Sequence, residues 1–297
     1  MTHTLVIQGP YHPFTVSTAL ANLENFSHII ISSWLEDKES FSDLITQLQG
    51  YDERIQILFS ESSRLNSSLA PDFLRAQVVT TCEALRRTKT IFVTKVRSDE
   101  FYDLTQWVKH AVFTSKDRES LTESGVILFS NFIVRPWSYH KFHISDHLFG
   151  GRTQVIADAL EALDQGKPLT SRDTLNALDS TCPESIIGRQ LFATIVDTYS
   201  PSLMSARSSN STRREWKLFS QYFRLFDLEE LKRFVVRARR AGVSNITSLK
   251  ALGSWFSRQG LNLDFVYVKR LSALRPRPSW LHNAMSFCRY FTRRLIG

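Results

Sequence analysis

The chain has 297 residues, of which 42% are hydrophobic, with a net charge of +8 and three cysteines. This length suits one catalytic-size domain with an appendage, and the composition is that of an ordinary globular protein. No apolar run approaches the roughly 20 residues that span a bilayer, and the first residues do not resemble a signal peptide. The cysteines also lack metal-ligand spacing, so we expect a cytoplasmic protein with reduced thiols.

Short apolar runs alternate with helix-like segments in the first third of the chain. The runs predict four strands, at residues 5–7, 28–31, 55–59 and 91–96. The segments between them predict helices, the third of which extends from about Pro71 to Arg87. Strands separated by helices of this length imply right-handed crossovers and an α/β fold. Its parallel, Rossmann-like half-sheet would gather the strand ends on one edge.

Charged residues gather where the fourth predicted strand ends. They are Lys95, Arg97, Asp99, Glu100 and Asp103. Gln8, Gly9 and Trp34 follow earlier strands and are predicted to lie on the same edge. Ligands of open α/β sheets bind outside the carboxyl ends of the strands, so the cluster suits a phosphate-bearing ligand and its metal ion. A solvated strand end would have the same composition.

Two cations of this cluster are candidates for neutralising phosphate. Lys95 and Arg97 are two residues apart and therefore on one face of the strand, although one of them could instead pair with Glu100 or Asp103. Gln77, near the start of the third helix, is a weaker candidate for a phosphate or base contact. The first strand is not followed by G-x-G-x-x-G, and no G-x-x-x-x-G-K-[ST] occurs. These absences argue against a dinucleotide cofactor and a P-loop nucleotide hydrolase.

A stretch rich in aromatic and titratable residues, 137–147, follows a predicted strand at 125–129 and is closed by Gly150 and Gly151. Its composition suits a sugar-binding loop, in which Asp146 is a candidate base or acceptor contact. Glu184, after Pro183, is the other candidate base, and its alternative role is to stabilise a first helical turn. The histidines of the stretch favour structural roles over zinc ligation, because no Cys or matching ligand pair accompanies them. They are His140, His143 and His147.

Six short segments follow one another in an order and spacing that resemble WavE-type lipopolysaccharide synthesis proteins. They are Val6–Pro10, Ile29–Trp34, Gln77–Thr81, Lys95–Asp99, Ile144–Gly150 and Pro183-Glu184. The resemblance covers roughly residues 4 to 190. It implies a glycosyltransferase of the nucleotide-sugar-binding GT-A fold, with a lipopolysaccharide or other surface glycan as acceptor. It also carries Arg97-Ser98-Asp99 onto the Asp-x-Asp metal triplet of that fold, with Arg97 in place of the first aspartate.

Sugar transfer from a nucleotide donor needs a positive charge against the leaving diphosphate and often a carboxylate that takes the acceptor proton. Asp99 is the candidate ligand for Mn²⁺ or Mg²⁺, and Lys95 or Arg97 could supply further charge. A nucleotidyltransferase acting on sugar phosphates is an alternative, although no Gly- and Arg-rich triphosphate loop lies near the first strand. A non-catalytic protein that binds glycan or nucleic acid is another, and it would need neither Asp99 nor metal.

The C-terminal part of the chain is strongly basic. From Arg213 onward it has 18 Lys+Arg against 5 Asp+Glu, while the preceding residues have 19 against 24. A polar segment, 205–214, separates a predicted catalytic domain, 1–204, from a basic helical region, 215–297. Helices are predicted from Asp227 to about Gly242 and at 246–256, 265–274 and 280–295.

The last of these predicted helices is amphipathic and basic. It would hold the protein on the cytoplasmic face of an anionic membrane, where a lipid-linked acceptor would be presented, or it would pack on the acidic body as a surface helix. No nucleic acid partner is expected.

Overall fold

The computed structural model describes residues 3–48, 53–61, 72–105, 107–108, 127–130, 144, 146–165, 183–199, 222–226, 236–237 and 268–270. Within these residues, one sheet has eight strands in the order β10-β8-β6-β7-β4-β1-β2-β3, and a second sheet pairs β5 with β9. The predicted α/β class with a mixed sheet flanked by helices is therefore confirmed.

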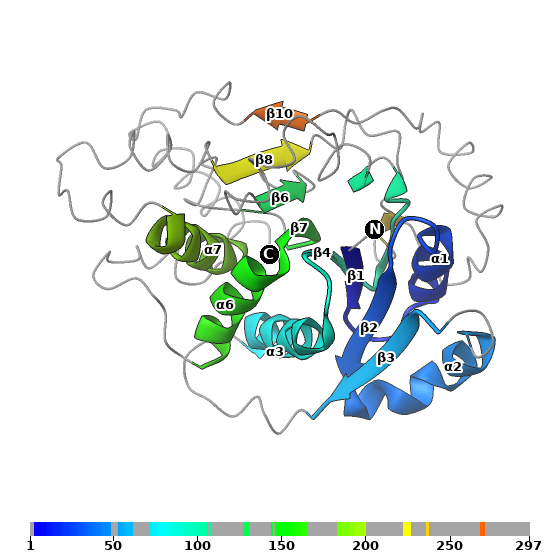
Figure 1. Ribbon diagram of the computed structural model, residues 1–297. Helices are drawn as coiled ribbons and strands as arrows, with labels where there is room; N and C mark the ends of the chain where they lie inside the picture. Colours follow the sequence, from blue (N-terminus) through cyan, green and yellow to red (C-terminus); the bar gives the residue numbers. More distant parts are fainter. Residues whose placement is uncertain are drawn as a thin grey trace, which may run out of the picture.

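Four parallel strands form one half of the large sheet (Figure 1). They are β1 (His3–Gln8), β2 (His28–Trp34), β3 (Ile55–Ser60) and β4 (Phe92–Arg97). The segments between them contain α1 (Pro13–Ala21), the 3-10 helix η1 (Leu35–Phe41), α2 (Ser42–Leu48) and α3 (Asp72–Arg87). This is the predicted Rossmann-like half-sheet, because apolar β-branched runs formed the strands and amphipathic segments formed the crossovers.

The other half of the sheet is mixed. It contains β6 (Ile127–Ser130), β7 (Leu148–Arg152), β8 (Phe223–Phe226) and β10 (Val268–Arg270). β7 runs antiparallel to both β4 and β6, whereas β8 is parallel to β6 and antiparallel to β10. Since Val96 pairs with Leu148, the residues just before β7 lie at the same edge as the residues just after β4.

Helices cover both faces of the sheet. Along β1, Leu5 and Ile7 belong to one core cluster and Val6 to the other, because successive strand residues point to opposite faces. The cluster around Val6 takes side chains from α3, α6 (Thr153–Asp164) and α7 (Pro183–Tyr199), and the other takes them from α1, η1 and α2. Figure 1 shows α3, α6 and α7 grouped apart from α1 and α2. The helices of the two core clusters thus pack on opposite faces of the sheet.

The structure corrects the expectation of a glycine-closed loop after His147. Leu148–Arg152 form β7, and Gly150 pairs with Thr94 of β4. A Cβ atom at Gly150 would lie 2.8 Å from the carbonyl oxygen of Val93 and 2.9 Å from Oγ1 of Thr94. Glycine is therefore present at this position because the two backbones approach closely.

Parts of the basic C-terminal region also differ from the prediction. The helices predicted over 227–242 and 265–274 are wrong at the positions that the structure describes, where β9 (Val236–Arg237) and β10 form strands. Val236 pairs with Phe101 of β5 (Glu100–Phe101), and Val268 pairs with Phe226, so sheet pairing of a β-branched residue prevails over local helix preference. The boundary at 205–214 and the helices predicted at 246–256 and 280–295 lie outside the described residues. None of the helices described is long and apolar enough to cross a bilayer.

His3 makes the fold sensitive to acid. Its fully buried ring packs edge-on against Phe26, and its Nε2 lies 2.8 Å from Oγ1 of Thr94. Burial lowers the pKa of His3 from 6.5 to about 3, so the folded protein keeps the imidazole neutral. Between these values only the unfolded chain takes up the proton. The free energy of unfolding is therefore expected to fall by on the order of 1 kcal/mol per pH unit as the pH drops below 6.5.

Urea unfolding of wild type and variants at a series of pH values measures this contribution. His3→Gln removes the titrating group and is expected to make the dependence shallower between pH 6.5 and 3. His28→Gln, at the exposed start of β2, is the matched control and is expected to leave the wild-type dependence unchanged. The same dependence in wild type and His3→Gln would contradict the prediction.

Candidate functional site at the carboxyl edge of the sheet

Backbone hydrogen bonds of Gln8 and Gly9 join the end of β1 to the ends of β2 and β4. The N–H of Gly9 donates to the carbonyl oxygen of Ser32 at 3.0 Å, and the N–H of Ser98 donates to that of Gln8 at 3.0 Å. Gly9 has a φ of 134°, and a Cβ atom there would lie 2.4 Å from Oγ of Ser98. Only glycine fits this position without strain. Gln8 and Gly9 thus set the spacing of the strand ends beside the charged cluster.

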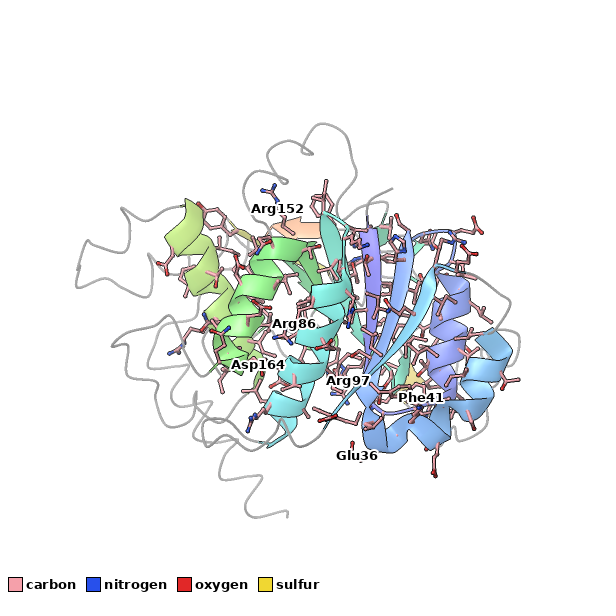
Figure 2. All side chains as sticks on the ribbon, turned by 60° about the horizontal axis from the view of Figure 1, so that its bottom comes forward. Glu36, Phe41, Arg86, Arg97, Arg152 and Asp164 are labelled. Carbon is pink, nitrogen blue, oxygen red and sulfur yellow. The ribbon has the colours of Figure 1, made fainter. Side chains whose placement is uncertain are left out.

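Arg97, the last residue of β4, is held between two carboxylates. Its Nε and Nη2 donate to the two carboxylate oxygens of Asp99 at 2.8 and 2.9 Å, and its Nη1 lies 3.6 Å from Oδ2 of Asp146. The side chains of Arg97 and Asp99 are each 25% exposed. Figure 2 shows Arg97 at one edge of the sheet and Arg152 at the opposite edge. A partly exposed, bidentate guanidinium of this kind suits recognition of a phosphate-bearing ligand.

Asp146 is the buried centre of the cluster. Its Oδ2 accepts a hydrogen bond from Nε2 of Gln77 at 2.8 Å, and its backbone carbonyl accepts one from Nζ of Lys95 at 2.6 Å. Burial alone would raise the pKa of Asp146, but the charges of Lys95, His147 and Arg97 outweigh it and lower the pKa below its ordinary value. Asp146 therefore stays ionised near neutral pH and fixes the positions of the groups around it.

Lys95 and Arg97 differ in how exposed they are to a ligand. Lys95 is only 2% exposed, and its ammonium lies 5.7 Å from the centroid of the Phe149 ring. Burial lowers its pKa to about 8, against the opposing charge of Asp146. Because Lys95 already donates to the Asp146 backbone, it supports the cluster from inside, whereas Arg97 is the cation that a ligand can meet.

Three further residues belong to the site. The sequence placed Glu100 in the charged cluster and favoured a structural role for His147, whereas Tyr102 was missed. Glu100, Tyr102 and His147 form a buried network in which Nδ1 of His147 lies 2.8 Å from Oε1 of Glu100 and the Tyr102 hydroxyl donates to Oε2. Burial and the Glu100 carboxylate raise the pKa of Tyr102 well above its usual value, so the hydroxyl keeps its proton. Nε2 of His147 lies 3.4 Å from Oδ1 of Asp146, which joins this network to the cluster. One feature of the sequence could have indicated Tyr102: it is two residues from Glu100, so the two side chains share a face of an extended chain.

The structure brings five of the predicted site residues together at one place. They are Gln77, Lys95, Arg97, Asp99 and Asp146. Trp34 ends β2 on the same edge and is partly exposed. Glu184 lies in the first turn of α7, as its alternative role required. His140 and His143 lie outside the described residues.

Comparison with known proteins gives weak similarities only. No family model matches the chain, and no curated protein matches it in sequence. Among solved structures it is similar to the 4-diphosphocytidyl-2C-methyl-D-erythritol synthase from Anaerococcus prevotii, with a TM-score of 0.39, 8% identity and coverage of 87% of this chain and 96% of that one.

A second similar structure is the galactosyltransferase LgtC in complex with donor and acceptor sugar analogs. The TM-score is 0.39 at 10% identity, with 72% of this chain and 82% of that one covered. A third is HddC from Yersinia pseudotuberculosis complexed with GMP-PN, with a TM-score of 0.33, 12% identity and 53% and 80% covered. Similarity at this level carries no argument about function, which depends on the geometry of the site.

The donor set at Asp99 does not fit the divalent ion that the resemblance implies. Both of its carboxylate oxygens accept hydrogen bonds from Arg97, so an ion on their remaining lone pairs would lie beside a fixed positive charge. Among the residues that the structure describes, no group of three His, Cys, Asp or Glu side chains is arranged to hold an ion. The described geometry therefore does not favour the prediction that Asp99 is a ligand of Mn²⁺ or Mg²⁺.

Proposed function

We propose that this protein is a glycosyltransferase that moves a sugar from a nucleotide-sugar donor to a lipopolysaccharide or other surface-glycan acceptor. The observation that supports the proposal is the partly exposed Arg97, clamped by Asp99 and Asp146 at the carboxyl end of the central strand β4. This is the edge at which α/β sheets bind phosphate-bearing ligands. The WavE-type segments contribute to the same edge, since Gln8, Arg97 and Asp146 all belong to them.

In the proposed reaction, the bond between the anomeric carbon and the diphosphate oxygen breaks, and its electron pair leaves with the diphosphate. The acceptor oxygen forms the new bond to that carbon, and its proton passes to a carboxylate and then to water. Arg97 faces the negative charge that grows on the diphosphate, and Asp146 with Gln77 keeps the guanidinium in position. Trp34 offers an aromatic face to the nucleobase or sugar.

Release of the nucleotide product tests the proposal without knowledge of the acceptor. Many sugar transferases hydrolyse their donor slowly, with water as the acceptor, so a panel of UDP-, GDP-, CDP-, ADP- and dTDP-sugars is incubated with the full chain. Release of the free nucleotide is expected for at least one donor. Arg97→Gln is expected to reduce this release by roughly 10-fold or more, because a charge-assisted hydrogen bond is lost. Arg152→Gln removes the same charge at the opposite edge and is expected to have no effect.

Two other results would identify one of the alternative functions. A nucleotidyltransferase would instead release pyrophosphate from a nucleoside triphosphate and a sugar phosphate, and that result would replace the proposal. Glycan binding with no nucleotide released from any donor would identify a non-catalytic binding protein.

We also propose that the protein works at the cytoplasmic face of an anionic membrane, where a lipid-linked acceptor is presented. The support is the residue spacing at 280–295: on a helix, Leu281, Met285 and Cys288 would share an apolar stripe, and Arg289 and Arg293 a basic one. Each basic residue near an anionic surface contributes about 1 kcal/mol, so attachment is expected to be weak and reversed by salt.

A further inference from the structure

The side chain of Arg97 supplies a positive charge at the site. All three guanidinium nitrogens of Arg97 face carboxylate oxygens: Nε and Nη2 those of Asp99, and Nη1 the Oδ2 of Asp146. Burial lowers the pKa of Arg97, but the hydrogen bonds to Asp99 and the charges of Asp99 and Asp146 outweigh it and raise the pKa above its ordinary value. Arg97 is therefore a permanent cation.

A divalent ion on Asp99 would have to displace this arrangement. Mn²⁺ or Mg²⁺ needs a carboxylate oxygen at about 2.0 to 2.2 Å, and both oxygens of Asp99 already bind the guanidinium. An ion placed there would also lie beside a like charge held in a fixed position, which disfavours binding. Arg97 thus stands at the first position of the triplet in sequence and donates to both carboxylate oxygens of its last residue, Asp99.

The other cation of the cluster cannot take this role. Lys95 is buried and donates to the backbone carbonyl of Asp146, whereas Arg97 and Asp99 keep a quarter of their side-chain surface exposed. A guanidinium has five N–H groups and Asp99 takes two of them, so the others, on Nη1 and Nη2, are the donors that a diphosphate could meet. Arg97 is also fixed in its orientation before a ligand arrives. A cation fixed in this way loses little conformational freedom on binding.

We propose that Arg97 takes the place of the divalent ion, with Asp99 holding its guanidinium, so that the nucleotide part of the donor binds without metal. The proposal rests on the proposed function, because it names the group that meets the donor diphosphate.

Nucleotide binding to the full chain, measured by isothermal titration calorimetry, tests it. UDP, GDP, CDP, ADP and dTDP are titrated in EDTA and again in excess MnCl₂, and at least one is expected to bind with the same dissociation constant in both. Arg97→Gln is expected to raise that constant by roughly 10- to 100-fold, as for a lost charge-assisted hydrogen bond. Arg97→Lys keeps the charge without the two-pronged geometry and is expected to fall between wild type and Arg97→Gln. Arg152→Gln, with the same change of charge at the other edge, is expected to bind as wild type does.

The outcomes separate this inference from the proposed function. Binding that requires Mn²⁺ would overturn the inference and leave a metal-dependent glycosyltransferase standing. Metal-independent binding that Arg97→Gln does not weaken would also overturn it, because another group would then supply the charge. Failure of all five nucleotides to bind under either condition would overturn both.

Discussion

Replacing Glu100 with alanine is expected to lower the free energy of unfolding by several kcal/mol, because two buried groups lose their hydrogen-bond acceptor at about 1 to 3 kcal/mol each. Glu100 is fully buried, and His147 beside it is 2% exposed, so water cannot replace the lost carboxylate. The substitution leaves Nδ1 of His147 and the hydroxyl of Tyr102 without their acceptor. Typical domains have only about 5 to 15 kcal/mol of stability, so this loss would be severe. Urea unfolding followed by circular dichroism measures it.

Glu83→Ala is the matched control for that measurement. Glu83 also has arginine partners, with Arg86 at 3.3 Å and Arg87 at 3.9 Å, but all three side chains are partly exposed. Its removal is expected to cost no more than about 1 kcal/mol, as for other surface ion pairs. Glu100→Gln keeps one acceptor oxygen and is expected to lie between the two. Equal losses for Glu100→Ala and Glu83→Ala would show that the buried network contributes no more than a surface pair.

Asp146→Asn is expected to reduce turnover by about 100-fold or more, with the protein still folded and still binding nucleotide. The amide has the shape of the carboxylate but not its charge, so Arg97 loses the anion that its Nη1 faces, while Lys95 keeps its hydrogen bond to the backbone carbonyl. Donor turnover and nucleotide binding are measured on the same preparation. If Asp146 positions the groups around it, its loss is expected to reduce turnover far more than nucleotide affinity. Normal turnover by Asp146→Asn would remove it from the site.

Glu184→Gln is the companion variant, because Glu184 was the other carboxylate proposed to take the acceptor proton. Its position in the first turn of α7 predicts near-normal turnover for the variant. The opposite pattern, with Glu184→Gln inactive and Asp146→Asn active, would assign the base to Glu184. If both variants turn over normally, an inverting mechanism with either residue as base is wrong.

The parallel half of the sheet could be predicted because its signals are local. Runs such as Ile29–Ile31 combine β-branched residues with burial on both faces, and α3 has an apolar stripe that a helical period identifies at once. The alternation of strands and helices was enough to predict that the carboxyl ends of the strands share one edge of the sheet. It therefore also predicted that Gln8, Trp34 and Arg97 lie on that edge.

The rest of the fold depends on contacts between distant residues. β7 contains Gly150 and Gly151, which read as a loop until the close approach of Val93 and Thr94 is known. Val236 and Val268 lie in sequences with a helical pattern, and only their partners in β5 and β8 make them strands. The sequence likewise could not show that Lys95 is buried while Arg97, two residues on, is partly exposed. The two charges looked equivalent because the alternation of a strand gives them the same face.

The antiparallel direction of β7 also affects the order in which the molecule can become functional. Arg97 and Asp99 are close in sequence, so their pair can form as soon as β4 exists. Asp146 reaches Lys95 across 51 residues, and only after β7 has paired with β4. Contacts over such separations form slowly, because the entropy of closing the loop is lost before any pairing offsets it. Because residues 1–99 leave the ribosome first, Arg97 and Asp99 can pair before the second carboxylate that faces Arg97 has been made, and the cluster is complete only when β7 has paired with β4.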